Sequence, residues 1–478
     1  MKESLIKIFE RWSGETPESF TALAQSGSYR KYFRMQSANH RAVGVYNSDK
    51  NENKAFITFT KHFLKQKLNV PKLYVEEIKN NVYLLQDLGD ESLFSFLANN
   101  RSDNEFPEKA IEFYKVALNE LIKFQTKASN KLDYSVCYPR SSFDRQSMMW
   151  DLHYFKYYFL KLTKIPFDEQ KLEDDFNSFT DYLLNAKTDF FMYRDFQSRN
   201  IMVKNNELYF IDYQGGRKGA LQYDVASILY DAKADIPQQV REKLIEHYLS
   251  ILTKEKVTEH SEFFKYYYGY VLIRILQALG AYGFRGIHEK KAHFLNSIPY
   301  AINNIKYLLS SGLLPEGLNE LHSVLKHITQ SNHFQNIGMK SETDKLLVSI
   351  NSFSYKSGIP VDYSGNDGGF VFDCRSLHNP GRYEEFKSLN GNNTQIIEFL
   401  NSQTDVQDFL TDVKSLVSRA INNYLNRGFS NLMINFGCTG GQHRSVYCAE
   451  KLAEFIKSGF DVEISLNHTE LKKLDLLK

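Results

Sequence analysis

Hydrophobic and polar positions follow two different periods in the first part of the chain. Apolar residues at helical spacing predict helices, and short apolar runs bounded by turn residues predict strands. The pattern gives helices over 2–12 and 53–67, and strands over 40–46, 70–74 and 82–85. From Pro107 onward apolar residues recur every three or four positions, so a helical region follows the strands. We therefore expect an α+β N-terminal domain made of a strand-rich lobe and a helical lobe.

A second succession of strands and helices occupies the C-terminal part of the chain. The pattern predicts strands over 346–353, 370–375 and 431–436, and helices over 405–426 and 446–457. Strands that alternate with helices are typical of a compact α/β domain with a partly parallel sheet. We expect this smaller α/β domain at 344–478.

A polar segment separates the two patterns. Residues 311–343 lose clear periodicity and contain the helix breakers Gly312, Pro315 and Gly317. We expect a linker there, because domain boundaries fall in exposed segments of this kind. The predicted organisation is a domain at 1–310, with an N-lobe at 1–90 and a C-lobe at 91–310, followed by the linker and the C-terminal domain.

Composition narrows the class of protein. A chain of 478 residues is too long for one compact core, and 42% hydrophobic residues with 14% aromatics are ample for buried cores. The formal net charge is only +2, so composition does not require nucleic-acid binding. The four cysteines form no Cys-x-x-Cys pair, which argues against structural zinc or disulfides and favours a reducing, cytoplasmic location. The most apolar run, 266–284, contains Arg274, so no membrane span is expected.

The main chemical motif begins at Asp195 and has the spacing Asp-x-x-x-x-Asn, which ends at Asn200. Two short apolar strands follow, joined at Asn205 and Asn206, a pair that tolerates the left-handed geometry of a tight turn. Such a hairpin returns Asp212 to the level of Asn200. This arrangement is the one that phosphoryl transfer of the protein-kinase type requires.

Each of these residue types suits one part of phosphoryl transfer. Asp195 would accept the proton of the attacking hydroxyl, and Asn200 and Asp212 are hard oxygen ligands for one or two Mg²⁺ ions. Arg199 would help to screen phosphate charge. The alternative is that Asp195 and Asn200 form only a loop or cap network and that Asp212 is a strand-end carboxylate.

A turn of glycine and serine near the N-terminus is the candidate phosphate loop. Gly27, Ser28 and Tyr29 stand between two predicted strands, where backbone N–H groups can approach phosphates, and Arg30 or Arg34 would add positive charge. A protein-kinase-like site usually adds a lysine on the third strand, and the corresponding strand here has none. The alternative is a plain hairpin turn.

Two further segments would complete such a site. The chain after the last strand of the first lobe is extended, and the backbone of Gln86 and Leu88 would face an adenine ring. An aromatic-rich helix over 147–160 carries Asp151, and aromatic rings with a carboxylate suit a sugar acceptor. The alternative is that these aromatics belong to the core. Asp224 is predicted to cap a helix and to support the catalytic loop.

With these motifs, the first 310 residues resemble the aminoglycoside-phosphotransferase-like superfamily, a small-molecule branch of the protein-kinase fold. Within it they resemble the anomeric kinases of N-acetylmuramic acid and N-acetylglucosamine. The resemblance covers the segments 27–34, 86–89, 151–155, 195–200 and 223–227. It implies a bilobal, protein-kinase-like fold, ATP and Mg²⁺ as cofactors, and an amino-sugar substrate phosphorylated at its anomeric hydroxyl in cell-wall recycling.

The main feature of the C-terminal domain is the loop 437–445, Gly-Cys-Thr-Gly-Gly-Gln-His-Arg-Ser, between a predicted strand and a predicted helix. Free N–H groups at the helix N-terminus, the helix dipole and Arg444 favour an anion such as phosphate. One alternative is a glycine turn needed only for packing. Another is a cysteine-dependent phosphatase, because Cys438 and Arg444 fit the spacing Cys-x-x-x-x-x-Arg, although no general acid can be assigned.

Residues 349–473 resemble the C-terminal domain of the RapZ family of RNase-adapter proteins, through the segments 352–360, 370–375, 379–380 and 437–445. The resemblance implies a pocket for a sugar phosphate such as glucosamine-6-phosphate, and a small RNA as a partner. The pocket residues that it implies are Thr439, Gly440, Gly441, His443, Arg444 and Ser445, together with Lys356, Arg375 and Asn379. The nucleotide-binding first half of that family is absent, and acidic residues slightly outnumber basic ones from Asp344 onward, which disfavours RNA binding.

The sequence thus predicts an ATP- and Mg²⁺-dependent amino-sugar kinase fused to a module that senses a phosphosugar. Three alternatives stay open at this stage. The chain could be a sensor or RNase-adapter-like regulatory protein, a kinase for another small alcohol, or a kinase fold without activity.

Overall fold

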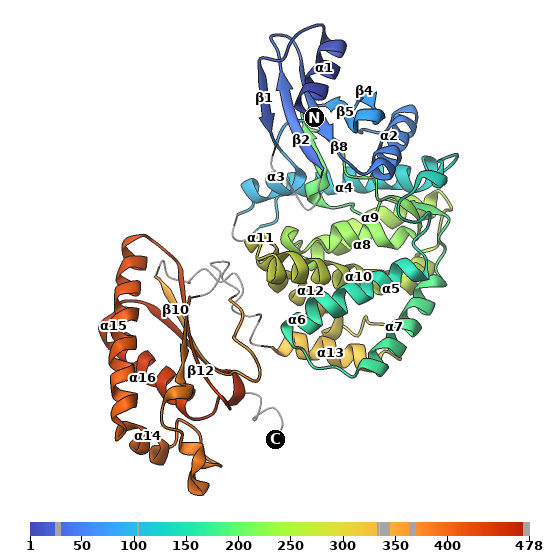
Figure 1. Cartoon of the computed structure of the whole chain (residues 1–478). Coiled ribbons are helices and arrows are strands. Elements are labelled where there is room, and N and C mark those ends of the chain that lie inside the picture. The colour runs from blue at the N-terminus through green and yellow to red at the C-terminus, as the bar shows by residue number, and fades with distance from the viewer. Residues whose placement is uncertain (24–29, 103–104, 332–333, 335–344, 363–368, 472–478) are drawn as a thin grey trace. The chain divides into compact units, whose positions relative to one another are not determined.

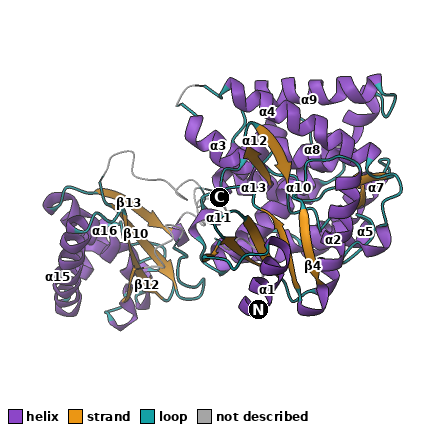
Figure 2. Cartoon of the chain, turned by 90° about the horizontal axis from the view of Figure 1, so that it is seen from above, coloured by secondary structure: helices purple, strands orange, loops and turns teal. Residues whose placement is uncertain are grey.

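The structure is a computed structural model and describes residues 1–478 apart from 24–29, 103–104, 332–333, 335–344, 363–368 and 472–478. The chain divides into two compact units (Figures 1 and 2). The first comprises Met1–Ala281 and Tyr300–Gln330, and the second comprises Tyr282–Pro299 and Ser331–Lys478. None of the helices in the described ranges is both long and apolar enough to cross a membrane.

A five-stranded antiparallel sheet forms the N-terminal lobe of the first unit. The strand order is β1-β2-β3-β5-β4, so β4 lies at one edge of the sheet. The strands are β1 (Ser19–Ala22), β2 (Lys31–Gln36), β3 (Arg41–Tyr46), β4 (Leu73–Glu77) and β5 (Val82–Gln86). In Figure 1 this sheet lies at one end of the unit and the helices of the second lobe lie at the other.

One helix packs on each face of this sheet. Successive side chains of a strand point to opposite faces. Leu84 therefore packs in the buried cluster that α1 (Lys2–Ser13) forms with the sheet, whereas Tyr83 stacks on Phe56 of α2 (Lys50–Lys65) at a ring distance of 5.3 Å. Both helices match the elements predicted from the sequence.

The second lobe of the first unit is mainly helical. Its helices are α3 (Leu93–Asn100), α4 (Glu108–Ile122), α5 (Arg145–Phe155), α6 (Lys161–Thr163), α7 (Glu169–Leu184), α8 (Leu221–Leu229), α9 (Gln238–Lys254), α10 (His260–Tyr282), α12 (Ile298–Ser310) and α13 (Asn319–Gln330). Two short antiparallel pairs join β6 (Phe190–Met192) to β9 (Arg217–Gly219) and β7 (Ile201–Lys204) to β8 (Glu207–Phe210). A sheet lobe followed by a helical lobe confirms the α+β class predicted for the N-terminal domain.

The segment predicted as a linker, 311–343, contains the helix α13, which belongs to the first unit. Leu321, Val324, Leu325 and Ile328 are buried on one face of α13. The N–H of Leu321 also donates to Asp175 Oδ2 at 2.8 Å. The predicted loss of periodicity is wrong for this stretch, because the four apolar residues have helical spacing and are only diluted by polar neighbours.

The second unit contains a four-stranded sheet whose described strands are all parallel, in the order β11-β12-β10-β13. The elements are α11 (Ala292–Leu295), β10 (Leu347–Ser354), β11 (Gly369–Asp373), α14 (Thr394–Asn401), α15 (Thr404–Asn426), β12 (Asn431–Cys438), α16 (Arg444–Gly459) and β13 (Glu463–His468). Val348, Ile434 and Leu452 lie at the centre of its buried core. The predicted α/β class is confirmed, and the sheet is more regular than the partly parallel one expected.

Three asparagines form a row across this sheet. Asn351 of β10 faces Asn435 of β12 and Asn467 of β13 in register. Asn351 Nδ2 donates to Asn435 Oδ1 at 3.0 Å, Asn467 Nδ2 donates to Asn351 Oδ1 at 3.4 Å, and Asn435 Nδ2 donates to the Phe370 carbonyl at 3.2 Å. Buried amides need such partners, so the row ties all four strands to one register.

Candidate active site and anion-binding loop

The loop after β6 and the hairpin β7–β8 bring three predicted site residues together. Asn205 and Asn206 have φ of 53° and 60°, the left-handed geometry expected for the tight turn. Asn200 Nδ2 donates to the backbone carbonyl of Asp195 at 2.9 Å and to Asp212 Oδ2 at 3.4 Å. The Asn200 amide, the Asp212 carboxylate and the backbone of Asp195 are therefore neighbours in space.

The charges of this group affect one another. Burial, and then the neighbouring carboxylate of Asp212, raise the pKa of Asp195 above its ordinary value. Asp212 itself has a φ of 69°, and its Oδ1 accepts a hydrogen bond from Gln214 Nε2 at 2.7 Å. Gln214 Oε1 is buried without a partner among the described residues. The sequence reasoning did not single out Gln214.

The donor atoms fit a hard cation. Oxygens of Asp212 and Asn200 are the ligand type that Mg²⁺ takes, usually together with water and phosphate oxygens. Among the described residues, no three His, Cys, Asp or Glu side chains gather as a metal-binding group. A metal at this place would therefore draw most of its remaining ligands from a nucleotide and from water.

Two buried carboxylates hold the ends of the catalytic loop. Asp224 accepts the N–H groups of Tyr193 at 2.7 Å and Arg194 at 2.9 Å, and Asp231 accepts the hydroxyl of Ser198 at 2.6 Å. Burial raises the pKa of Asp224 to about 7, while the two N–H donors act in the opposite direction.

The helix-capping role predicted for Asp224 is wrong. The N-cap of α8 is Ala220, and Asp224 lies one turn inside the helix with no exposed surface. Its support of the catalytic loop is direct, because its carboxylate binds the loop backbone and not the helix end.

Arg30 lies beside Asp212, the carboxylate predicted to bind the metal. Its guanidinium is 3.1 Å from Glu52 Oε1 and 3.9 Å from Asp212 Oδ1, and the residue is only 2% exposed. Glu52 belongs to the first turn of α2. Glu52 is half-buried, and the ion pair resembles in charge the lysine–glutamate pair of a protein kinase. Glu52 was missed from the sequence, where the only signal is an acidic residue in the first turn of a helix. Gly27, Ser28 and Tyr29 lie outside the described residues.

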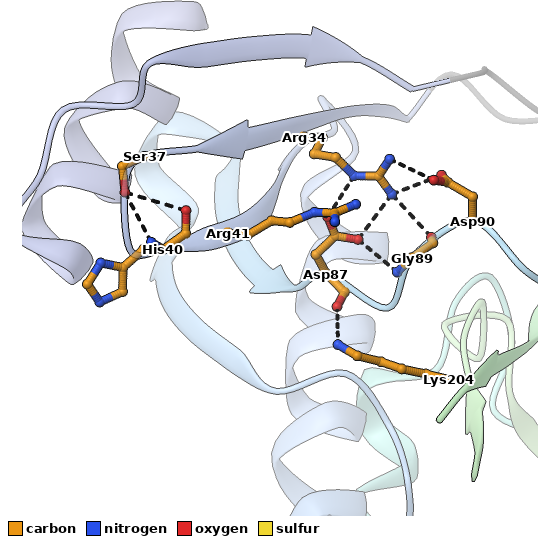
Figure 3. Close-up of polar contacts among 8 residues, drawn as sticks. All are labelled: Arg34, Ser37, His40, Arg41, Asp87, Gly89, Asp90 and Lys204. Carbon is orange, nitrogen blue, oxygen red and sulfur yellow. Dashed lines mark hydrogen bonds and ion pairs between the residues drawn. The ribbon is translucent and has the colours of Figure 1, made fainter. Parts of the chain in front are cut away.

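Arg34 is placed differently from Arg30. Its guanidinium donates to Asp87 Oδ2 at 2.6 Å and to Asp90 Oδ1 at 2.9 Å, beside the chain that links the lobes (Figure 3). Asp87 also accepts Arg41 Nε at 2.5 Å, and its carbonyl accepts Lys204 Nζ at 2.7 Å. Arg34 is therefore not brought to Asp212. Asp87 instead joins the linking chain to both lobes, through Arg34 and Arg41 on one side and Lys204 on the other.

A cavity of about 410 Å³ lies against the same linking chain. Its lining includes the predicted nucleotide residues Gln86 and Leu88, together with Val203 and Lys204 of the hairpin strand β7. Asp195, Asn200 and Asp212 do not line this cavity, which is bordered by the linking chain and the hairpin.

Asp151 and Arg194 form an ion pair next to the catalytic loop. Arg194 donates to Asp151 Oδ1 and to the Tyr223 hydroxyl, both at 2.6 Å. Asp151 Oδ2 is buried and has no hydrogen-bond partner among the described residues. Arg199, in the turn before Asn200, is exposed to solvent.

The loop of the second unit joins the end of β12 to α16, as predicted. Cys438 Sγ accepts the N–H of Gly441 at 3.1 Å and lies 3.2 Å from Ser445 Oγ. Arg444 is 5% exposed and donates to the carbonyls of Arg375 and Leu377 at 2.8 and 2.9 Å. The guanidinium is thus held by a neighbouring segment, which is not the arrangement of a cysteine-dependent phosphatase, where the arginine binds phosphate.

The other predicted pocket residues fall into two groups. Lys356, Thr439 and Gly440 are exposed, and Arg375 is exposed beside Asp373 with its guanidinium 4.0 Å from the Tyr355 ring centre.

His443 and Asn379 are instead used within the fold. The Nε2 of His443 lies 3.0 Å from the Phe386 carbonyl, and burial lowers the pKa of His443. Asn379 Oδ1 accepts the N–H of Gly381 at 3.2 Å. The carboxyl edge of the sheet therefore presents backbone groups and exposed cations, while part of the predicted pocket shapes the loops.

The fold and this constellation define a two-lobed phosphotransferase joined to a second α/β unit. Residues 19–260 match the model of the phosphotransferase enzyme family, and the chain belongs to that family. Residues 346–472 match the RapZ C-terminal domain. Both matches confirm the two resemblances found in the sequence and the predicted class of enzyme, a phosphotransferase.

Curated relatives match about a third of the chain or less. A nucleotide-binding protein of Saccharophagus degradans is 35% identical over 156 residues, which is 33% of this chain and 49% of that protein. A nucleotide-binding protein of Thermosipho africanus is 37% identical over 128 residues, which is 27% of this chain and 43% of that protein. The chain spans about half the length of these curated relatives.

Solved structures that resemble the chain are kinases with low sequence identity. The choline kinase of Cryptosporidium parvum is 14% identical, with a TM-score of 0.46 over 68% of this chain and 100% of that one. The ethanolamine kinase of Plasmodium vivax is 13% identical, with a TM-score of 0.45 over 62% of this chain and 84% of that one.

Proposed function

We propose that the first unit transfers a phosphoryl group from ATP to a hydroxyl of an amino sugar, with Mg²⁺ as cofactor, and that the second unit binds a sugar phosphate. The observation that carries the proposal is the meeting of Asp195, Asn200 and Asp212 at the end of one hairpin. The ion pair between buried Arg30 and half-buried Glu52, next to Asp212, supports it.

The roles follow from the positions. Asp195 orients the acceptor hydroxyl and takes its proton, and its raised pKa strengthens it as a base. Asn200 and Asp212 hold the metal, which when bound neutralises phosphate charge. Arg30, held by Glu52, would face the phosphates, and the backbone at Gln86 and Leu88 would face the adenine ring.

The substrate class rests on the resemblance to the anomeric kinases of amino sugars. We propose N-acetylmuramic acid or N-acetylglucosamine as acceptor, phosphorylated at the anomeric hydroxyl in cell-wall recycling. The names of the choline and ethanolamine kinases point to another acceptor class, a small amino alcohol. Asp151 on α5 is the proposed contact with the sugar.

The second unit would bind a phosphosugar such as glucosamine-6-phosphate at the carboxyl edge of its parallel sheet. Ligands of open α/β sheets bind at this edge, and the N-terminus of α16 favours an anion there. Exposed Lys356 and Arg375 would add charge, and Thr439 and Gly440 would offer backbone and hydroxyl groups.

The first test is ATP consumption against a panel of amino sugars, aminoglycosides and amino alcohols, with the phosphorylated position read by NMR. We expect an amino-sugar 1-phosphate, and a loss of about 10²–10⁴-fold in kcat for Asp195→Asn. Phosphate only on a choline-like alcohol would contradict the amino-sugar acceptor, and equal turnover by the variant would contradict the kinase.

A second candidate function is a regulatory one, in which the phosphosugar controls the kinase or an RNA-processing partner. It is favoured by the match of residues 346–472 to the RapZ C-terminal domain. Coupling between two sites is reciprocal, so glucosamine-6-phosphate would change the affinity for nucleotide and nucleotide would change the affinity for the phosphosugar. Independent binding in both directions would exclude regulation within the chain.

A further inference from the structure

One carboxylate oxygen near the catalytic loop lacks a hydrogen-bond donor. Asp151 lies on α5 and is only 7% exposed, and its Oδ2 is buried with no partner in the described part of the chain. Nearly all buried carboxylate oxygens in proteins accept at least one hydrogen bond. An orphan of this kind beside an active site indicates that a ligand brings the donor.

This oxygen belongs to the surroundings of the proposed base. Arg194 precedes Asp195 in the chain and donates to the other oxygen of Asp151 at 2.6 Å. A Cβ built on Gly215 would lie 3.8 Å from both Arg194 Cγ and Asp195 Oδ2. These are ordinary van der Waals distances, so Gly215 lies directly beside both the proposed base and the arginine that holds Asp151.

The charges here disfavour a cationic acceptor. Arg194 balances the charge of Asp151, and a second arginine, Arg217, is buried at 6% exposure and donates to the Gly215 carbonyl at 3.0 Å. The surroundings of Asp151 thus lack a donor but already have sufficient positive charge. A neutral hydroxyl supplies the donor without adding charge, whereas a quaternary ammonium group supplies no donor and adds a charge.

We propose that Asp151 Oδ2 accepts a hydrogen bond from a second hydroxyl of the acceptor, so that the substrate class is a neutral or anionic polyhydroxylated molecule and not a quaternary ammonium alcohol. This inference rests on the proposed kinase function. Asp151 is then a specificity residue, because it accepts a hydrogen bond from a hydroxyl that does not react.

The test compares the best sugar acceptor with its series of monodeoxy analogues in the wild-type protein and in Asp151→Asn. In the wild type, removal of one non-reacting hydroxyl should lower kcat/KM at least about 10-fold, mainly through KM. In the variant the amide oxygen stays with Arg194, so the amide nitrogen replaces the orphan oxygen and offers a donor where an acceptor is needed. The parent sugar and that deoxy sugar should then react at similar rates.

Tyr223→Phe is the matched control. It removes the other hydrogen-bond partner of Arg194 and leaves Asp151 Oδ2 in place. This variant should lower kcat while keeping the ratio between the parent and the deoxy sugar. Thermal unfolding of each variant shows whether the fold is kept, and the deoxy series in the wild type tests the proposal without any variant.

Three outcomes would overturn the inference: no deoxy sugar reacts more than about twofold more slowly in the wild type, Asp151→Asn keeps the full discrimination, or choline is as good an acceptor as the sugar. Phosphorylation of any acceptor would leave the kinase function standing in these cases. If no acceptor is phosphorylated and none binds to Asp195→Asn by calorimetry, the proposed function itself fails and the inference fails with it.

Discussion

The two candidate sites are built in opposite ways. In the first unit the groups proposed for chemistry are side-chain oxygens of Asp195, Asn200 and Asp212, and buried carboxylates hold the loop that carries Asp195 and Asn200. In the second unit the groups proposed to bind a ligand are largely backbone N–H groups of a glycine loop, and the buried Arg444 binds a neighbouring segment. A charged residue in a motif can therefore be the reagent in one site and the scaffold in the other.

Among changes that keep the proposed reacting groups, the largest effect is expected from loosening the scaffold of the first site. Asp224→Asn replaces one acceptor oxygen by a donor, so either the Tyr193 or the Arg194 N–H loses its partner, at a cost of about 1–3 kcal/mol. We expect kcat to fall about 100-fold, with phosphosugar binding to the second unit unchanged. Steady-state kinetics and calorimetry on the same protein check both parts. A kinetically normal variant would mean that the loop does not depend on this anchor.

A smaller effect is expected from the glycine loop. Gly441 has a φ of +68°, and a Cβ there would lie 2.4 Å from Glu470 Cγ and 2.8 Å from the Ser354 nitrogen. Gly441→Ala should weaken glucosamine-6-phosphate binding about 10-fold or more and leave ATP turnover intact.

Gly459→Ala, at the opposite end of α16, is the control for this change, because a Cβ at Gly459 meets no atom within 4 Å. Calorimetric titration of the two variants measures the difference. Equal binding by both would show that the loop backbone does not form the anion site.

The smallest effect is a difference in pH dependence. Since the pKa of Asp195 is raised and its carboxylate is the active form, kcat should fall on acidification at a pH above the ordinary aspartate pKa of 3.8. The glycine loop of the second unit would bind an anion largely through backbone N–H groups, which do not titrate, so binding of a sugar sulfate, whose charge does not titrate either, should not follow that curve. Parallel pH profiles of kcat and of sulfate binding would contradict this distinction.

The sequence was informative wherever local geometry decides the outcome. Asn205 and Asn206 specify the tight turn, and that turn alone places Asp212 near Asn200. The glycine loop after a strand and before a helix was equally readable, because both flanking elements have clear periodicity.

Contacts that depend on packing between distant elements could not be predicted. Arg30 and Arg34 are close in sequence and both basic, but only the docking of α2 gives Arg30 its partner Glu52, while Arg34 meets Asp87 more than fifty positions away. Asp224 was assigned to a helix end because its residue type favours caps, and the fold uses it against a loop from another element.

The strand order of the second unit has a consequence for how the chain folds. The central strand β10 pairs on both sides with later strands, β12 and β13, and β13 ends only at His468. Pairings between segments so far apart in sequence close slowly, and during synthesis they must wait until the last strand has emerged. The first unit can therefore complete its fold while the strand edges of β10 are still open, and removal of the last strand would expose one of them to pairing with another chain.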